Sequence, residues 1–286
     1  MTTHTKQRDA LIRLIAIDLD GTLLNSESEI SLANRQALVA AAERGVQLVI
    51  VTGRRFHSAS RFVAYIPCPV ILISSNGARI TDSSGEVHHR NFLPRSIARQ
   101  ILEVAGDYRP YTVAIFDMPG RGQVTMQDNA AAEGPLGWYL RNSPDCLAQV
   151  PALEAALSTD PIQVMFGGPP ERIESLEPLL HTSPAAASVH LTWTKYPARN
   201  VSILDVMNHD CSKGAALSLW AARWGILPGE VMAIGDNYND LEMLSFAGHP
   251  VLMGNCTAAM QSNGWPMTLT NEEDGVAAAI RRLVLG

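Results

Sequence analysis

The feature that most constrains the fold is the alternation of short, continuously apolar runs with segments of helical periodicity. Runs rich in Val, Ile and Leu occupy 11–19, 46–51 and 70–73, and helical patterns occupy 31–45 and 54–66 between them. Strands that are apolar on both faces are typical of parallel sheets covered by helices on both sides. The first third of the chain therefore predicts a doubly wound α/β sheet.

The middle of the chain has a different character. From about Thr81 to Met207 it is richer in Pro and Gly, and its predicted strands are shorter and less uniformly apolar. Strands are predicted at 111–118, 162–168, 187–194 and 200–206, and helices at 94–106 and 170–181. This mixture predicts a separate α+β unit built on an antiparallel sheet.

The parallel pattern resumes toward the C-terminal end. Helices and strands alternate again at 212–225, 230–236, 239–248, 250–254 and 272–284. We therefore predict one α/β domain made of residues 1–81 and 209–286, interrupted by an inserted domain at 82–208.

The composition argues against two classes of partner. The chain has 286 residues, a formal net charge of −6 and a pI near 5.7, and no basic run stands out. It therefore lacks the positive surface that nucleic acid or an anionic membrane would require. No apolar run approaches the roughly 20 residues of a membrane helix, and the N-terminal segment has no cleavage site of the signal-peptide kind.

The chain is therefore expected to be soluble and cytoplasmic. Its four cysteines, Cys68, Cys146, Cys211 and Cys256, are scattered and include no CxxC pair. They are interpreted as free thiols in a reducing compartment, neither a disulfide framework nor a zinc site. The composition has no signature of oligomeric state.

Reactive polar side chains stand where predicted strands end or helices begin. They are Asp18, Asp20, Thr52, Lys213, Asp236 and Asp240. Any one of the aspartates could simply cap a helix or form a turn. Because ligands of open α/β sheets bind at the carboxyl ends of the strands, the gathering of all six at one edge indicates a binding site.

The carboxylates at this edge need a partner. Two of them about 4 Å apart repel by roughly 4 kcal/mol at an effective dielectric constant of about 20, so several together require raised pKa values or a cation. Oxygen ligands without a nearby His or Cys favour Mg²⁺ over zinc. Lys213 and Thr52 would add charge and hydrogen bonds for a transferring phosphoryl group.

Four short motifs resemble, in order, those of the haloacid dehalogenase (HAD) superfamily. They are DLDGT at 18–22, VTGR at 51–54, SKG at 212–214 and GDNYND at 235–240. SSNGA at 74–78 and AGHPVLMGN at 247–255 further resemble the Cof-type subfamily, subclass IIB. The resemblance covers Leu11–Thr81 and His209–Gly286, and it implies an α/β HAD core with an α+β cap domain of the C2B type inserted after the third core strand.

The resemblance implies the catalytic roles. Asp18 is the implied nucleophile, which attacks phosphorus and forms an aspartyl-phosphate. Asp20 is the implied general acid, which protonates the leaving alcohol and then acts as the base that activates water. Asp18, Asp236 and the backbone carbonyl of Asp20 are the implied ligands of Mg²⁺.

Other motif residues are implied to hold the phosphoryl group and to support the metal ligands. Thr52 and Lys213 would bind phosphoryl oxygens. Asn239 and Asp240 would orient Lys213 and metal-bound water. The full set predicted to bind phosphate or substrate is Thr22, Thr52, Gly53, Asn76, Lys213 and Asn239.

Weaker candidates lie beside these motifs. His88 and His89 are interpreted as part of a surface loop, because no third metal ligand is evident near them. Arg54 and Arg55 could face the mouth of the site or lie in a solvated helical turn. The aromatic and cationic residues at 193–200 could grip a leaving group, although a loop between two strands explains them more simply.

These residues predict a Mg²⁺-dependent phosphatase that hydrolyses a small phosphate monoester, either a sugar phosphate or a phosphorylated cofactor. A large cap would close over the site, exclude bulk water and select the leaving group. Two alternatives stay open, a phosphomutase acting on hexose phosphates and a non-catalytic regulatory protein that binds phosphate. A phospho-aspartate receiver domain is disfavoured because such domains are shorter and carry no inserted domain.

Overall fold

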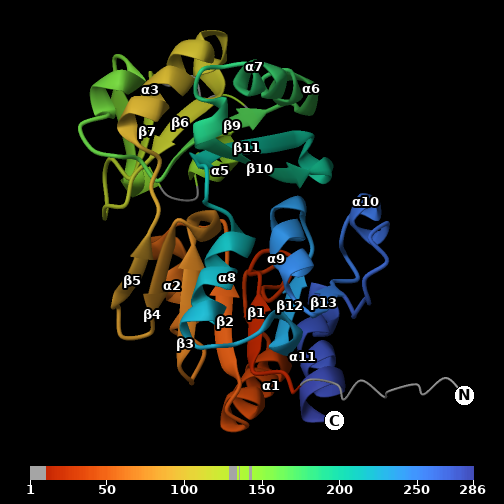
Figure 1. Ribbon diagram of the computed structural model, residues 1–286. Coiled ribbons are helices and arrows are strands. Elements are labelled where there is room, and N and C mark those ends of the chain that lie inside the picture. The colour runs from red at the N-terminus through yellow and green to blue at the C-terminus, as the bar shows by residue number, and fades with distance from the viewer. Residues whose placement is uncertain (1–10, 129–133, 135, 142–143) are drawn as a thin grey trace, which may run out of the picture.

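The computed structural model describes residues 11–128, 134, 136–141 and 144–286. These residues form two bodies, one above the other, each built on its own β-sheet (Figure 1). We call the body that contains β1–β5, β12 and β13 the core, and the body that contains β6–β11 the cap. The chain passes from core to cap after β5 and returns after β11, so the cap is an insertion in the core.

The core sheet contains seven described strands in the order β13-β12-β1-β2-β3-β4-β5. They are β1 (Leu14–Ile17), β2 (Gln47–Val51), β3 (Val70–Ser74), β4 (Arg79–Asp82), β5 (Val87–Arg90), β12 (Val231–Gly235) and β13 (His249–Leu252). The five strands from β13 to β3 run parallel, and β4 and β5 continue the sheet as antiparallel strands. The predicted parallel α/β sheet is confirmed.

Helices cover both faces of the core sheet. They are α1 (Leu32–Glu43), α2 (Phe56–Val63), α8 (Lys213–Arg223), α9 (Leu241–Phe246), α10 (Ala258–Gln261) and α11 (Gly275–Ile280). Ile15 and Ile17 of β1 pack with α1, α2 and α11. Leu14 and Ala16, which alternate with them, pack with α8 and α9 on the other face. This burial on both faces is the reason that the strand is apolar throughout.

The local signals at the ends of α1 are also confirmed. The Ser31 side chain accepts a hydrogen bond from the Asn34 N–H at 3.1 Å, as an N-cap residue does. Beyond the other end of the helix, Gly45 adopts a φ of +79°, a conformation that glycine reaches without strain.

The cap sheet has six described strands in the order β10-β11-β9-β6-β7-β8. They are β6 (Thr112–Ile115), β7 (Val124–Gln127), β8 (Leu147–Val150), β9 (Gln163–Gly168), β10 (Val189–Tyr196) and β11 (Val201–Asn208). All neighbouring strands are antiparallel except β7 and β8, which are parallel. The helices α3 (Arg95–Val104), α6 (Pro170–Glu174) and α7 (Glu177–His181) pack on one face, and α5 (Gly137–Arg141) contributes Leu140 to the apolar cluster on the other.

Some elements differ from the sequence-based expectation. The proposed boundary after residue 81 falls inside β4, and the β4–β5 hairpin pairs with the core sheet. The helix expected at 170–181 is divided into α6 and α7. The segment 193–200 is not simply a loop, because β10 extends to Tyr196 and only the turn at Pro197–Arg199 follows it.

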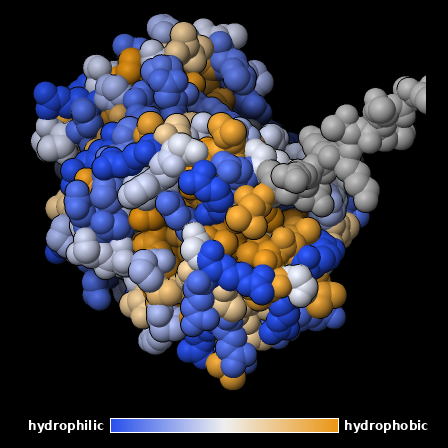
Figure 2. Space-filling model, turned by 60° about the horizontal axis from the view of Figure 1, so that its bottom comes forward, coloured by the Kyte–Doolittle hydropathy of each residue, from blue (hydrophilic) through white to orange (hydrophobic). Residues whose placement is uncertain are grey.

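The face of the core opposite the cap is partly apolar. Figure 2, which brings the underside forward, shows apolar side chains gathered among polar ones there. Exposed apolar residues of the core include Leu219 and Trp224 in and just after α8, and Leu227 beyond it. Within the described ranges, no helix is long and apolar enough to cross a membrane.

Candidate active site

The four motifs meet at one edge of the core sheet, where β1, β2 and β12 end and α8 begins. Asp18 directly follows β1, Thr52 follows β2, and Asp236 follows β12. Lys213 is the first residue of α8, after the N-cap residue Ser212. The carboxyl ends of parallel strands therefore gather these side chains at the edge that faces the cap (Figure 1).

The Lys213 ammonium is buried between two carboxylates. Its Nζ lies 2.6 Å from Asp18 Oδ1 and 2.7 Å from Asp240 Oδ1. Burial lowers the pKa of Lys213, but the two carboxylates outweigh it and raise this pKa above its ordinary value. Burial likewise raises the pKa of Asp18 well above its usual range, and the charge on Lys213 opposes that rise. Lys213 is thus a permanent positive charge beside Asp18.

Asp240 fixes the loop that carries Asp236. Its Oδ2 accepts hydrogen bonds from the backbone N–H groups of Asp236 and Asn237, at 3.0 and 3.1 Å. A Cβ atom on Gly235 would lie 2.6 Å from Asp240 Cγ, so the close approach requires glycine. Asp240 therefore connects this loop to Lys213.

Asp236 is buried against Thr22 and Gly21. Thr22 Oγ1 donates a hydrogen bond to Asp236 Oδ1 at 3.1 Å. Burial raises the pKa of Asp236 to about 7, and the neighbouring Asp240 adds to the rise. Gly21 has a φ of +80°, and a Cβ atom there would lie 2.5 Å from Asp236 Oδ2. The structure therefore places Thr22 against a carboxylate and away from the cleft described below.

Thr52 and Gly53 are placed differently from each other. Thr52 is buried, and its hydroxyl accepts a hydrogen bond from the Arg54 N–H at 3.1 Å. Gly53 lines the cleft, and a Cβ atom there would lie 3.0 Å from Asn76 Oδ1. The backbone at Gly53, more than the Thr52 side chain, therefore borders the space that a ligand would enter.

Asp20 differs from the other acids because its side chain is 49% exposed. Arg54 binds both of its oxygens, with Nε 2.7 Å from Oδ2 and Nη2 2.5 Å from Oδ1. The same guanidinium lies 4.5 Å from the centre of the Phe62 ring on α2. Arg54, which the sequence indicated only weakly, therefore belongs to the site.

A chain of hydrogen bonds joins the core to the cap through Asn76. Asn239 Nδ2 donates to Asn76 Oδ1 at 3.1 Å, and Asn76 Nδ2 donates to Asp205 Oδ2 at 2.9 Å. Asp205 lies on β11 and also accepts a hydrogen bond from Gln163 Nε2 at 2.5 Å. Asn76 has a φ of 52°, a left-handed conformation that few residues other than glycine adopt. Both ends of its amide are thus occupied by protein partners.

The loop after β12 also contacts the cap. Asn237 Nδ2 donates to the backbone carbonyl of Lys195 at 3.2 Å, and the Lys195 N–H donates to Asn237 Oδ1 at 3.4 Å. Sequence reasoning did not identify Lys195, Gln163 or Asp205 individually. Lys195 lies within the aromatic and cationic segment 193–200 that the sequence indicated weakly, whereas the only signal for Gln163 and Asp205 was a polar residue within a mainly apolar strand.

A cleft of about 640 Å³ lies between the acidic edge of the core and the cap. Residues of the core that line it include Asp18, Asp20, Gly53, Arg54, Asn76, Asp236 and Asn239. Residues of the cap that line it include Gln163, Met165, Lys195, Tyr196, Arg199, Ile203 and Asp205. This volume suits a small molecule.

Three carboxylates, two at the floor of the cleft and one buried behind it, could hold a metal ion. Ligand oxygens of Asp18, Asp236 and Asp240 lie within 4.8 Å of one another. A buried set of carboxylate oxygens without nitrogen or sulfur ligands fits Mg²⁺. Asp240 already binds Lys213 and the loop N–H groups, so Asp18 and Asp236 are the better-placed side-chain ligands. The Asp20 side chain is occupied by Arg54 instead.

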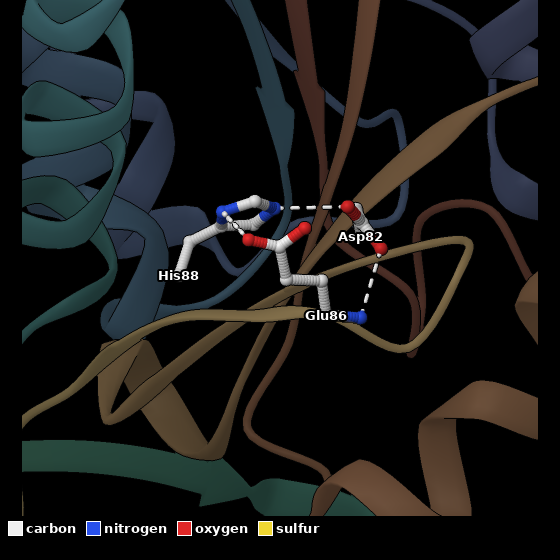
Figure 3. A group of neighbouring side chains, drawn as sticks. All are labelled: Asp82, Glu86 and His88. Atoms are coloured by element: carbon white, nitrogen blue, oxygen red, sulfur yellow. Dashed lines mark hydrogen bonds and ion pairs between the residues drawn. The ribbon is translucent and has the colours of Figure 1, made fainter.

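A second acidic group lies in the β4–β5 hairpin, where Asp82, Glu86 and His88 point toward one another (Figure 3). It corrects the expectation that no third ligand lies near His88. His88 Nε2 lies 2.9 Å from Asp82 Oδ2, whereas Nδ1 lies 3.8 Å from Glu86 Oε1. These two contacts join the carboxylates to opposite nitrogens of the ring, although one ligand atom of each of the three residues lies within 4.8 Å of the others. Asp82 Oδ1 also accepts the N–H groups of Ser84 and Glu86, at 2.8 and 3.0 Å, so the group stabilises the turn.

Comparison with known proteins places the chain among phosphatases. The family model described as haloacid dehalogenase-like hydrolase matches residues 15–280. Phosphatase YwpJ of Bacillus subtilis (strain 168) is 30% identical over 293 residues, which cover 96% of this chain and 100% of that protein. The HMP-PP phosphatase of Serratia proteamaculans (strain 568) is 30% identical, across 88% of this chain and 87% of that protein.

Solved structures share the architecture. A haloacid dehalogenase-like hydrolase from B. subtilis is 28% identical with a TM-score of 0.78, covering 95% of this chain and 100% of that one. Another from Bacteroides thetaiotaomicron is 26% identical with a TM-score of 0.74, covering 95% of this chain and 99% of that one. The predicted combination of an α/β core and an inserted α+β cap is confirmed. The chain therefore belongs to the haloacid dehalogenase-like hydrolase family, as a phosphatase of the Cof type.

Proposed function

We propose that this phosphatase hydrolyses small phosphate monoesters through an aspartyl-phosphate on Asp18, and that it uses Mg²⁺. The observation that carries the proposal is the position of Asp18, which is buried at the floor of the cleft with Lys213 bound to Oδ1. Because Lys213 occupies Oδ1, we assign Oδ2 to the attack on phosphorus. The fixed charge of Lys213 also favours the approach of a phosphate dianion.

Two steps would return the enzyme to its starting state. In the first, an Asp18 oxygen bonds to phosphorus as the ester oxygen leaves, and Asp20 gives that oxygen its proton. In the second, Asp20 takes a proton from water, whose oxygen attacks phosphorus and releases inorganic phosphate and free Asp18. The exposure of Asp20 at the cleft supports this role, since a group that exchanges protons needs contact with substrate and water. Before the first step Asp20 must carry a proton, so one of its oxygens would have to leave Arg54.

The metal would be held by Asp18, Asp236 and the backbone carbonyl of Asp20. Bound Mg²⁺ would neutralise negative charge on these carboxylates and on the phosphoryl group. The raised pKa values of Asp18 and Asp236 support a cation here, because their burial makes two uncompensated charges costly. Thr22 orients Asp236, and Asp240 orients Lys213.

The cap limits the substrate to a small molecule. The cleft of about 640 Å³ leaves room for a metabolite but not for a folded phosphoprotein. Two relatives are named as an HMP-PP phosphatase and a 5-amino-6-(5-phospho-D-ribitylamino)uracil phosphatase, which supports a phosphorylated metabolite. We place the enzyme in the cytoplasm, because its four cysteines are free thiols.

Hydrolysis of p-nitrophenyl phosphate tests this function. Wild-type protein should release p-nitrophenol with Mg²⁺ but not with EDTA, and Asp18→Asn should lose at least about 1,000-fold in kcat/KM. Asp107→Asn, which changes an exposed aspartate of the cap, should behave as wild type. Hydrolysis at the wild-type rate by Asp18→Asn would rule out the proposed nucleophile.

A further inference from the structure

We propose that Asp205 and Gln163 form an acceptor subsite in the cap, which recognises a hydroxyl or amino group on the leaving group of the substrate. This inference rests on the proposed function and adds the chemical class of the group that departs with the ester oxygen. It concerns two residues that the hydrolytic steps above do not use.

The two side chains lie together on the cap face of the cleft. Gln163 begins β9 and Asp205 lies on the neighbouring strand β11. Both line the cleft, although they are only 3% and 4% exposed. Gln163 Nε2 donates to Asp205 Oδ1 at 2.5 Å. Both side chains are therefore held in place in the wall of the cleft.

The orientation of Gln163 leaves an acceptor unpaired. A carboxylate can only accept hydrogen bonds, so Gln163 must turn its Nε2 toward Asp205 and its Oε1 away. Gln163 Oε1 is buried and has no donor among the residues that the structure describes. Buried carbonyl oxygens in folded proteins are nearly always paired. The missing donor is therefore one that a ligand would supply.

Asp205 also lacks compensation for its charge. Its two hydrogen-bond donors are the neutral amides of Asn76 and Gln163, and no cation of the described ranges bonds to it. Burial raises the pKa of Asp205 to about 7, and the two amide donors only oppose that rise. Each carboxylate oxygen accepts one hydrogen bond here and has capacity for another. A hydroxyl or amine entering from the cleft would donate this additional hydrogen bond.

The charge of the pair identifies which part of the substrate it meets. The phosphoryl group belongs at the Lys213 edge, and a carboxylate on the cap would repel a phosphate or a second acidic group. The leaving group is the part that extends from the core edge toward the cap. Asp205 is joined through Asn76 to Asn239 at that edge, so a donor bound here would be held in a fixed position relative to the phosphoryl group.

A matched pair of substrate types measures the preference. The donor-bearing esters are hexose 6-phosphates, glucosamine 6-phosphate and pentitol phosphates. The donor-free ester is cyclohexylmethyl phosphate, which is also a primary ester and has a ring of similar size. At a pH near 8, where Asp205 is mostly ionised, the wild type should favour its best donor-bearing ester by about 10- to 100-fold in kcat/KM, as expected for a hydrogen bond to a buried charged group.

Two variants assign the preference to the pair. In Asp205→Asn, Gln163 can rotate its amide and offer Oε1 to the new amide, so the network stays paired and the fold should survive. Gln163→Met keeps the side-chain length and removes the unpaired acceptor. In both variants the preference for the donor-bearing ester should fall to within about threefold of unity. Asp107→Asn should keep the full preference, and thermal melting establishes that each variant is folded.

The outcomes separate the subsite from the enzyme function. Hydrolysis by the wild type without any preference for donor-bearing esters overturns the subsite alone. An equal loss on both ester types in the two variants, with the preference unchanged, also overturns it, because the pair would then only support the fold. Failure of the wild type to hydrolyse any ester, p-nitrophenyl phosphate included, overturns the proposed function and the subsite with it.

Discussion

At the scale of single residues, the acids of the site differ chiefly in burial. Asp18 and Asp236 are buried, and their burial raises both pKa values, whereas Asp20 is half exposed and bound to Arg54. A buried carboxylate suits the proposed nucleophile because competing water is excluded around it. An exposed one suits the proposed acid and base. The division of roles between Asp18 and Asp20 thus has a physical basis in their surroundings.

Gly21 offers a test of how closely the first motif packs against Asp236. Gly21→Ala should lower the free energy of unfolding by about 2–3 kcal/mol, because alanine is strained at this positive φ and its Cβ would crowd Asp236. It should also reduce kcat/KM at least about tenfold, because Asp236 would be displaced. Gly45→Ala is the matched control, since its φ of +79° is nearly the same but no described atom lies within 4 Å of the added Cβ. It should cost about 1 kcal/mol and leave activity intact. Urea unfolding measures the stability of both variants, and p-nitrophenyl phosphate kinetics measure their activity. An equal loss of activity in Gly21→Ala and Gly45→Ala would contradict the packing argument.

The sequence locates residues well where they stand in motifs and poorly where they stand in strands. Asp18, Lys213 and Asp236 follow or begin elements that were readily predicted, so their common edge could be inferred. Asp205 and Gln163 lie within or beside apolar strands. Nothing in the sequence indicates that their side chains meet each other and face the cleft.

At the scale of elements, β11 connects the cap to the core site through Asp205. Burial holds the pKa of Asp205 near 7, above the ordinary value of 3.8. The folded protein therefore retains a proton at Asp205 that the unfolded chain releases. This contribution to stability is fully present below about pH 3.8 and is lost as the pH rises through about 7.

The pH dependence of unfolding checks this sign. The free energy of unfolding of the wild type, relative to Asp205→Asn, should fall by on the order of 2 kcal/mol between about pH 5 and about pH 8. Urea unfolding of both proteins at the two pH values gives the difference. Protonation changes of all other groups occur in both proteins and therefore cancel. A difference that stays constant, or rises with pH, would contradict the assignment of a raised pKa.

The elements that the sequence predicted best are the long apolar strands with helices between them. β7 and β8 were not predicted, and neither was the pairing of β4 and β5 with the core sheet, because these short strands carry polar residues. The division between α6 and α7 also escaped prediction. Pro178 lies in the first turn of α7, where its missing N–H is tolerated; within one continuous helix it would interrupt the hydrogen bonds.

At the scale of the whole molecule, the site is completed by two bodies that touch through specific contacts. Asn237 pairs with Lys195 of the cap, and Asn76 pairs with Asp205 of the cap. The loop after β12, which carries the proposed metal ligand Asp236, and the turn after β3 are therefore both in contact with the cap. The alternation of the sequence predicts the two bodies, but only the three-dimensional arrangement identifies these contacts.

Metal binding should stabilise the whole molecule. Saturating Mg²⁺ should raise the Tm of the wild type by about 3–5 °C, because an ion bound only by the folded state favours folding. Asp236→Asn should abolish the shift. Asp82→Asn, which alters the acidic group of the β4–β5 hairpin, should retain it. A shift that persists in Asp236→Asn and disappears in Asp82→Asn would place the ion in the hairpin instead.

The formation of the aspartyl-phosphate is tested most directly with Asp20→Asn and p-nitrophenyl phosphate. The p-nitrophenolate leaving group needs little help from an acid, so Asp18 should still be phosphorylated, whereas release of phosphate should be slow without the base. Rapid mixing should therefore give a burst of about one equivalent of p-nitrophenolate per enzyme, with phosphate bound to the peptide that contains Asp18. Release of p-nitrophenolate and inorganic phosphate together, with no burst and no phosphorylated Asp18, would contradict the covalent mechanism.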